Sequence, residues 1–149
     1  AVKAAGAKGV MLNHAEHKLT PDVLEKTIQR ADEVGLATIV CADTVEEVKA
    51  IAHMAPNIIV AEPTELIGTG QTSSMEYVRK TIETVRQINE EIMVLQGAGI
   101  KNGNDVYRVI SSGAMATGST SGIILAKDPY AMVEEMIYNL RLAWDRIHK

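Results

Sequence analysis

Short, uninterrupted apolar runs recur along this chain, and each is followed by a segment with helical periodicity. Because the apolar residues are continuous and do not alternate with polar ones, the runs are typical of strands buried on both faces of a parallel sheet. The alternation therefore predicts an α/β fold, in which helices cover a parallel sheet. The five predicted strands are residues 10–12, 36–42, 57–61, 92–96 and 114–118.

The helical segments carry their own start signals. Thr20 and Pro21 begin the first helix, and Asp43 is expected to cap the second. Further helices are predicted over residues 75–89, from about residue 103, and over residues 128–147. The last of these is expected to bury a stripe made of Val133, Ile137, Leu140 and Trp144.

No repeat, low-complexity segment or linker interrupts these units, so the chain predicts one domain without an internal boundary. Residues 1–9 read like the last turns of a helix that closes at a glycine cap. We therefore expect that further residues precede them.

Ligands of parallel α/β folds bind where the strands end at their carboxyl termini. The chain lacks the GxGxxG fingerprint of a doubly wound, nucleotide-binding sheet, and this favours a closed barrel. The residues expected at the strand ends, and therefore at a site, are His14, Glu16, Cys41, Glu62, 97–99 and 120–122.

Glu62 ends an apolar strand, where partial desolvation suits a carboxylate that accepts a proton. Pro63 stiffens one end of the following loop, whereas Gly68 and Gly70 free the other. This asymmetry is expected of a hinged lid over a small substrate. The alternative is a strand-end glutamate in a salt bridge, followed by an ordinary glycine turn.

His14 also ends a strand, and two interpretations stay open: a structural histidine, or an acid or electrophile that faces the same pocket as Glu62. Glu16 either orients this site or is solvated. Cys41 is interpreted as a packing residue, since buried thiols are usually inert. The four histidines form no metal-binding pattern, so we expect no metal.

Two turns of small residues follow strands, namely Gly97-Ala98-Gly99 and Thr120-Ser121-Gly122. Small residues let a ligand approach backbone N–H groups closely, as phosphate-binding loops require. The net charge of −4 gives no indication of nucleic acid or of an anionic membrane surface as a partner. The single cysteine suits a reducing compartment such as the cytoplasm.

Several motifs resemble those of one family. Residues 62–70, EPTELIGTG, resemble the catalytic-glutamate and lid motif of triosephosphate isomerases, particularly the archaeal type with its EPPELIGTG. Residues 13–18, NHAEHK, resemble that family's N-H-S-E motif. Residues 97–100 (GAGI) and 120–122 (TSG) fall where its phosphate-binding loops lie, and the resemblance covers the whole chain.

The resemblance implies a (β/α)8 barrel and the interconversion of glyceraldehyde 3-phosphate and dihydroxyacetone phosphate in glycolysis and gluconeogenesis. It implies that Glu62 is the base, that His14 polarises the carbonyl and that Glu16 supports the site. It further implies phosphate contacts, no metal or organic cofactor, and a cytoplasmic homo-oligomer when full length. The implied phosphate-binding residues are Ile67, Gly68, Gly99, Thr120 and Ser121.

The chain departs from the family pattern at Ala15, where the family has serine, and at Thr120, where it usually has alanine. The match places residues 9–14 on the fourth barrel strand, so only about five β/α units are expected here. The first three strands and their Asn-x-Lys motif are absent from these 149 residues. We therefore expect residues 1–149 to be the C-terminal portion of a single barrel domain.

Three alternatives to a triosephosphate isomerase stay open. The first is an isomerase of another short phosphosugar, for example a tetrulose phosphate, because Ala15 and Thr120 leave room for it. The second is a non-catalytic phosphosugar-binding module. The third is a truncated structural remnant without activity.

Overall fold

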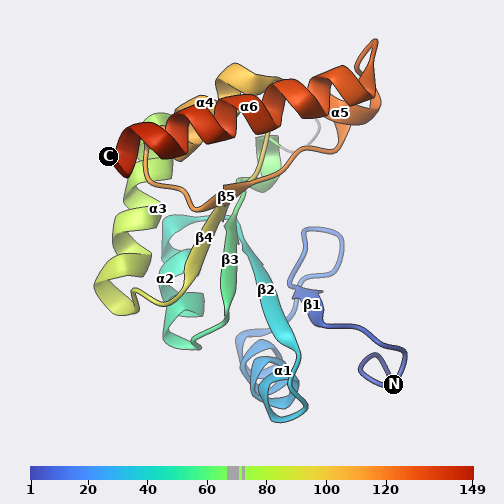
Figure 1. Cartoon of the computed structure of the whole chain (residues 1–149). Coiled ribbons are helices and arrows are strands. Elements are labelled where there is room, and N and C mark those ends of the chain that lie inside the picture. Colours follow the sequence, from blue (N-terminus) through green and yellow to red (C-terminus); the bar gives the residue numbers. More distant parts are fainter. Residues whose placement is uncertain (67–70, 72) are drawn as a thin grey trace.

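The computed structural model describes residues 1–66, 71 and 73–149. Its centre is a five-stranded parallel sheet in the order β1-β2-β3-β4-β5, so each strand pairs with the next one in the sequence (Figure 1). This arrangement confirms the predicted α/β class. The strands are β1 (Gly9–Leu12), β2 (Ala37–Ala42), β3 (Ile58–Ala61), β4 (Met93–Gln96) and β5 (Ala116–Thr117).

Helices alternate with these strands, and α2 and α3 lie side by side while α4 packs against α6 (Figure 1). Short helices also occur after β3 and after β5, where the sequence did not predict them. The helices are α1 (Pro21–Glu33), α2 (Val45–His53), the 3₁₀ helix η1 (Thr64–Leu66), α3 (Met75–Ile88), α4 (Gly103–Ser111), α5 (Ser121–Ile124) and α6 (Pro129–Ile147).

Two of the expected helix starts differ in detail. Thr20 precedes α1 as expected, but its hydroxyl donates to the carboxylate of Asp22 and caps no backbone N–H group. Asp43 does not cap α2, because Thr44 holds that position and its hydroxyl accepts from the N–H of Glu47. The carboxylate of Asp43 is consequently available for another contact.

The amino-terminal segment forms turns that end at Gly6, whose φ of 94° is in the left-handed region. The N–H of Gly6 bonds to the carbonyl of Lys3, and the N–H of Ala7 bonds to that of Val2. This pair of hydrogen bonds is the pattern found at a glycine-capped helix end, but the residues before Gly6 form turns and not the predicted helix.

The core lies between the sheet and the helices. Val40, Ile59 and Val94 project from neighbouring strands into this layer, and each is at most 3% exposed. The opposite face of the sheet carries a row of apolar residues in register: Met11, Ile39, Ile58 and Met93. Met11 and Met93 are 58% and 40% exposed, so this second face is only partly covered.

The predicted buried stripe of the last helix is confirmed only in part: Leu140 is partly buried against the core, but Ile137 and Trp144 are not on the buried side. Met136 and Ala143 are the buried residues of α6, whereas Ile137 is 62% exposed and Trp144 is 38% exposed. Helix α6 has apolar residues over a wide arc, and its packing against α4 selects one side of that arc. Periodicity alone could not identify which side is buried.

We expect Ile59→Ala to lower the free energy of unfolding by about 2–5 kcal/mol, because it leaves a cavity in the central strand of the core. Ile137→Ala is the matched control, and it should change that free energy by less than about 0.5 kcal/mol. Urea unfolding followed by circular dichroism measures both. Equal effects of the two substitutions would contradict the position of the core.

Candidate active site

A cavity of about 580 Å³ opens at the carboxyl ends of the strands. It brings together five of the residues for which the family resemblance implies a catalytic or phosphate-binding role: His14, Glu62, Gly99, Thr120 and Ser121. Glu16 does not line it, and Ile67 and Gly68 lie outside the described residues, as does Gly70. The other lining residues are Met11, Cys41, Val60, Leu95, Gly97, Ala98, Ile100, Gly118 and Ser119.

Glu62 follows β3 and is held from both sides. Its backbone N–H donates to the carbonyl of Ala42 at 2.9 Å, which extends the pairing between β2 and β3 by one residue. Its Oε1 accepts from the N–H of Ala98, also at 2.9 Å. The half-buried carboxylate therefore lies against the loop that follows β4, with a fixed orientation in the cavity.

The close approach of Glu62 depends on Gly97. A Cβ atom at position 97 would lie 3.0 Å from both Cδ and Oε1 of Glu62. In the described part of the chain Glu62 forms no ion pair, so the salt-bridge alternative has no support. The carboxylate keeps its second oxygen for a ligand.

His14 projects into the cavity from a loop that Asn13 anchors. Asn13 is 3% exposed and adopts a φ of 58°. Its Nδ2 donates to the carbonyl of Cys41 at 2.9 Å, and its Oδ1 accepts from the N–H of Leu19 at 3.0 Å. These bonds fix the loop against the end of β2.

The contact with Glu16 indicates the tautomer of the His14 ring. The backbone N–H of Glu16 donates to Nδ1 of His14 at 3.3 Å. Because a backbone N–H can only donate, Nδ1 accepts, and the proton of the neutral imidazole is on Nε2. The carboxylate of Glu16 is 90% exposed and lies 3.6 Å from Nδ1, so Glu16 contacts His14 through its backbone.

The two glycine-containing turns pack against each other at the far side of the cavity. Ala98 and Gly99 both adopt left-handed backbone conformations, with φ values of 50° and 72°. The hydroxyl of Ser119 donates to the carbonyl of Ile100. A side chain at Gly122 would collide with that same carbonyl, so glycine is required for this contact.

Cys41 lines the cavity, but the residue is only 6% exposed. Burial, followed by the negative charge of Glu62, raises the pKa of the thiol to about 11. The thiol is therefore protonated at neutral pH, which agrees with a packing role and not with a nucleophile.

Among the described residues, no group of His, Cys, Asp and Glu side chains is arranged to hold a metal ion. None of the helices in the same residues is long and apolar enough to cross a membrane.

Two residues that contact the site were not singled out from the sequence. Ala98 was seen only as part of a small-residue turn, although its N–H orients Glu62. Asn13 was included only as the first residue of the NHAEHK motif; asparagine is enriched at positive φ, and this signal could have indicated its role in the loop.

We expect Gly97→Ala to displace the carboxylate of Glu62 and to weaken its bond to Ala98, because the new Cβ would be in contact with Cδ and Oε1. The amide hydrogen of Ala98 should then exchange about 10-fold faster in an NMR exchange experiment. Gly118→Ala is the control, since nothing lies within 4 Å of a Cβ there. Unchanged exchange in Gly97→Ala would contradict the contact.

The thiol of Cys41 should resist alkylation by iodoacetamide at pH 7–8 in the folded protein. The rate of alkylation should rise only as the pH approaches the thiol pKa of about 11. The raised pKa keeps the thiolate scarce below that value. In urea the same thiol should react with the profile of an ordinary cysteine, near pH 8.5. Rapid labelling of the folded protein at pH 7 would contradict the burial of Cys41.

Comparison with known proteins places this geometry in a family. The model of the family "Triosephosphate isomerase" matches residues 1–131. The triosephosphate isomerase of Sulfurisphaera tokodaii is 40% identical over 147 residues, which covers 97% of this chain and 64% of the relative. The triosephosphate isomerase of Methanobacterium bryantii is 40% identical over 139 residues, which covers 91% of this chain and 62% of the relative. The chain thus spans slightly less than two thirds of these relatives' length.

Solved structures support the fold. The 3-hexulose-6-phosphate synthase of Salmonella typhimurium superposes with a TM-score of 0.71 at 17% identity, covering 95% of this chain and 65% of that protein. The thiamine phosphate pyrophosphorylase of Pyrococcus furiosus superposes with a TM-score of 0.70 at 19% identity, covering 95% of this chain and 63% of that protein. The five β/α units are therefore those of a partial (β/α)8 barrel, and the chain belongs to the triosephosphate isomerase family.

Proposed function

We propose that this chain carries the reacting pair of an aldose–ketose isomerase that interconverts glyceraldehyde 3-phosphate and dihydroxyacetone phosphate. One observation carries the proposal: a carboxylate oriented by the Ala98 N–H and an imidazole whose Nδ1 accepts from the Glu16 N–H line the same cavity. Triosephosphate isomerases are themselves the standard example of a glutamate base combined with a neutral histidine. A pure binding module needs neither group.

In the proposed reaction, Glu62 takes a proton from the carbon next to the substrate carbonyl. The C–H electron pair forms the new C=C bond, and the carbonyl oxygen takes the negative charge. The Nε2–H group of His14 donates to that oxygen and stabilises the enediolate. The original carbonyl oxygen then gains a proton and the hydroxyl on the adjacent carbon loses one, with His14 carrying the proton between the two oxygens. Glu62 returns its proton to the former carbonyl carbon while the adjacent C–O bond becomes the new carbonyl, so the carboxylate is regenerated and no redox step or cofactor is needed.

The turns around Gly99, Thr120 and Ser121 are proposed to bind the substrate phosphate. All three residues line the same cavity as Glu62 and His14, and the glycine leaves backbone N–H groups accessible. For Ile67 and Gly68 the proposal rests on the motif alone. No lysine or arginine is among the described lining residues, so a cation for the phosphate and the enediolate must come from elsewhere in the whole protein.

We propose that the described units belong to a single barrel domain, the C-terminal portion of a longer protein, as the shared length with the relatives supports. The partly open sheet face with Met11 and Met93 is suited to such completion, because apolar surface of this size is normally covered. We further propose a cytoplasmic homo-oligomer that acts in glycolysis and gluconeogenesis on a small phosphosugar, without nucleic acid or membrane partners.

Thr120 favours one alternative substrate. It lines the cavity, is exposed, and its hydroxyl caps no backbone group of α5. This extra hydrogen-bonding group suits a different short phosphosugar, such as a tetrulose phosphate. Exchange assays with both substrates discriminate between the two isomerases.

The test of the base is deuterium incorporation from D₂O into dihydroxyacetone phosphate, followed by NMR. Glu62→Asp should lower the rate by about 100-fold, because the shorter carboxylate no longer reaches the carbon. Binding of 2-phosphoglycolate, whose carboxylate copies the enediolate charge, should change little. Glu25→Asp, at an exposed position in α1, is the control and should exchange like the parent.

The assay is run on residues 1–149 alone and on the longest natural polypeptide that contains them. An unchanged rate in Glu62→Asp would exclude Glu62 as the base. If neither parent protein exchanges deuterium but both bind 2-phosphoglycolate, the phosphosugar-binding module is the correct function.

A further inference from the structure

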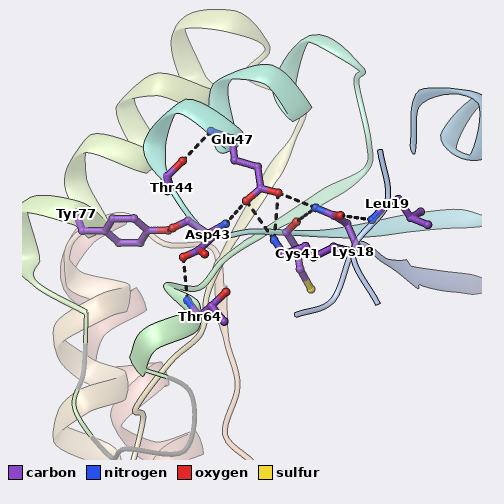
Figure 2. Close-up of polar contacts among 9 residues, drawn as sticks. Lys18, Leu19, Cys41, Asp43, Thr44, Glu47, Thr64 and Tyr77 are labelled. Atoms are coloured by element: carbon purple, nitrogen blue, oxygen red, sulfur yellow. Dashed lines mark hydrogen bonds and ion pairs between the residues drawn. The ribbon is translucent and has the colours of Figure 1, made fainter. Parts of the chain in front are cut away.

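Asp43, the residue after β2, connects three segments through three different groups (Figure 2). Its backbone N–H donates to Oε2 of Glu47 in α2 at 2.7 Å. Its Oδ1 accepts from the N–H of Thr64, two residues after Glu62, at 2.9 Å. Its carbonyl accepts from the hydroxyl of Tyr77 in α3 at 2.7 Å.

The contacts with Thr64 and Tyr77 lie at the two ends of the segment that begins at Glu62. Thr64 lies at its start, in η1, and Tyr77 lies at its end, in the first turn of α3. Both are therefore attached to one residue of the neighbouring strand end. Glu62 itself is attached to the same strand end through the carbonyl of Ala42.

The other side of this network reaches the loop of His14. Glu47 accepts from Nδ2 of Asn13 at 2.9 Å and from Nζ of Lys18 at 3.1 and 3.2 Å. Asn13 directly precedes His14, and Lys18 ends the same loop. A continuous series of hydrogen bonds therefore joins the His14 loop to the start of the Glu62 segment through Glu47 and Asp43.

We propose that Asp43 is a positioning residue, which holds Glu62 at the correct place relative to His14. The proposal rests on the function proposed above. Displacement of a catalytic group by about 1 Å can reduce turnover by as much as 100-fold. Asp43 is not among the described residues that line the cavity, so its effect acts through Thr64 and the backbone of Glu62.

Local chemistry shows why the carboxylate has this role. An aspartate before a helix normally caps it, but Thr44 caps α2 and leaves Oδ1 of Asp43 for Thr64. The EPPELIGTG motif has proline at the position of Thr64 and has no N–H group to donate there. The bond to Asp43 is therefore a property of this chain's threonine.

The test compares three variants in the longest natural polypeptide that contains this chain. Asp43→Ala removes the acceptor, Asp43→Asn keeps an acceptor oxygen without the charge, and Asp32→Ala changes an exposed aspartate of α1. Two measurements are made on each. They are the amide hydrogen exchange of Ala98, which reports the Glu62 carboxylate, and the kinetics of isomerisation of glyceraldehyde 3-phosphate.

We expect Asp43→Ala to accelerate exchange at Ala98 by about 10-fold and to lower kcat by about 10-fold, with KM changed by less than about threefold. Asp43→Asn should show the parental exchange rate at Ala98 and the parental kcat, because its amide oxygen still accepts from the N–H of Thr64. Asp32→Ala should behave like the parent protein.

Three outcomes would overturn the proposal: parental values in Asp43→Ala, an equal loss in Asp43→Asn, or an increase in KM alone. If the parent protein shows no turnover, the isomerase function fails, and the exchange at Ala98 still decides whether Asp43 positions Glu62. If Asp43→Ala does not fold, Tyr77→Phe takes its place. It removes the second attachment to Asp43 and should accelerate the same exchange; unchanged exchange would overturn the proposal.

Discussion

Parallel pairing in a single register is the constraint on which the site depends. Ala42 pairs with Ala61, Ala61 with Gln96, and Gln96 with Thr117. The next residue of each strand therefore lies at the same level, which brings Glu62 beside Gly97 and Asp43 beside Glu62. A shift of one residue would turn each side chain to the opposite face of the sheet, and the contact between Glu62 and Ala98 would be lost.

The site edge is rich in carboxylates. Burial raises the pKa of Tyr77 well above its usual range, and the charges of Asp43, Glu47 and Glu62 add to this effect. The same surroundings keep Cys41 protonated. Lys18, bound to Glu47, is the cation that the described structure places within this cluster. An anionic ligand bound in this part of the molecule would therefore depend on backbone N–H groups and on His14.

Much of the fold and of the site was predictable because each depends on local pattern. Continuous apolar runs located all five strands, and the residues that end them led to Glu62, His14 and the two glycine turns. The predictions that were wrong concerned competition between neighbours. Asp43 and Thr44 are both good caps, and only packing assigned the cap to Thr44. Helix α6 has apolar residues on two sides, and its packing against α4 buries Met136 and leaves Ile137 exposed.

By itself the sequence determined which residues end the strands and which chemical groups they carry, because strand burial and glycine turns are encoded over a few neighbouring positions. Only the tertiary structure decided how those groups are oriented. The Ala98 N–H that holds Glu62 is 36 residues away from it, and Asp43 bonds to Thr64 across 21 residues. Such contacts arise only after the strands pair, since a hydrogen bond depends on distance and angle that no local pattern specifies.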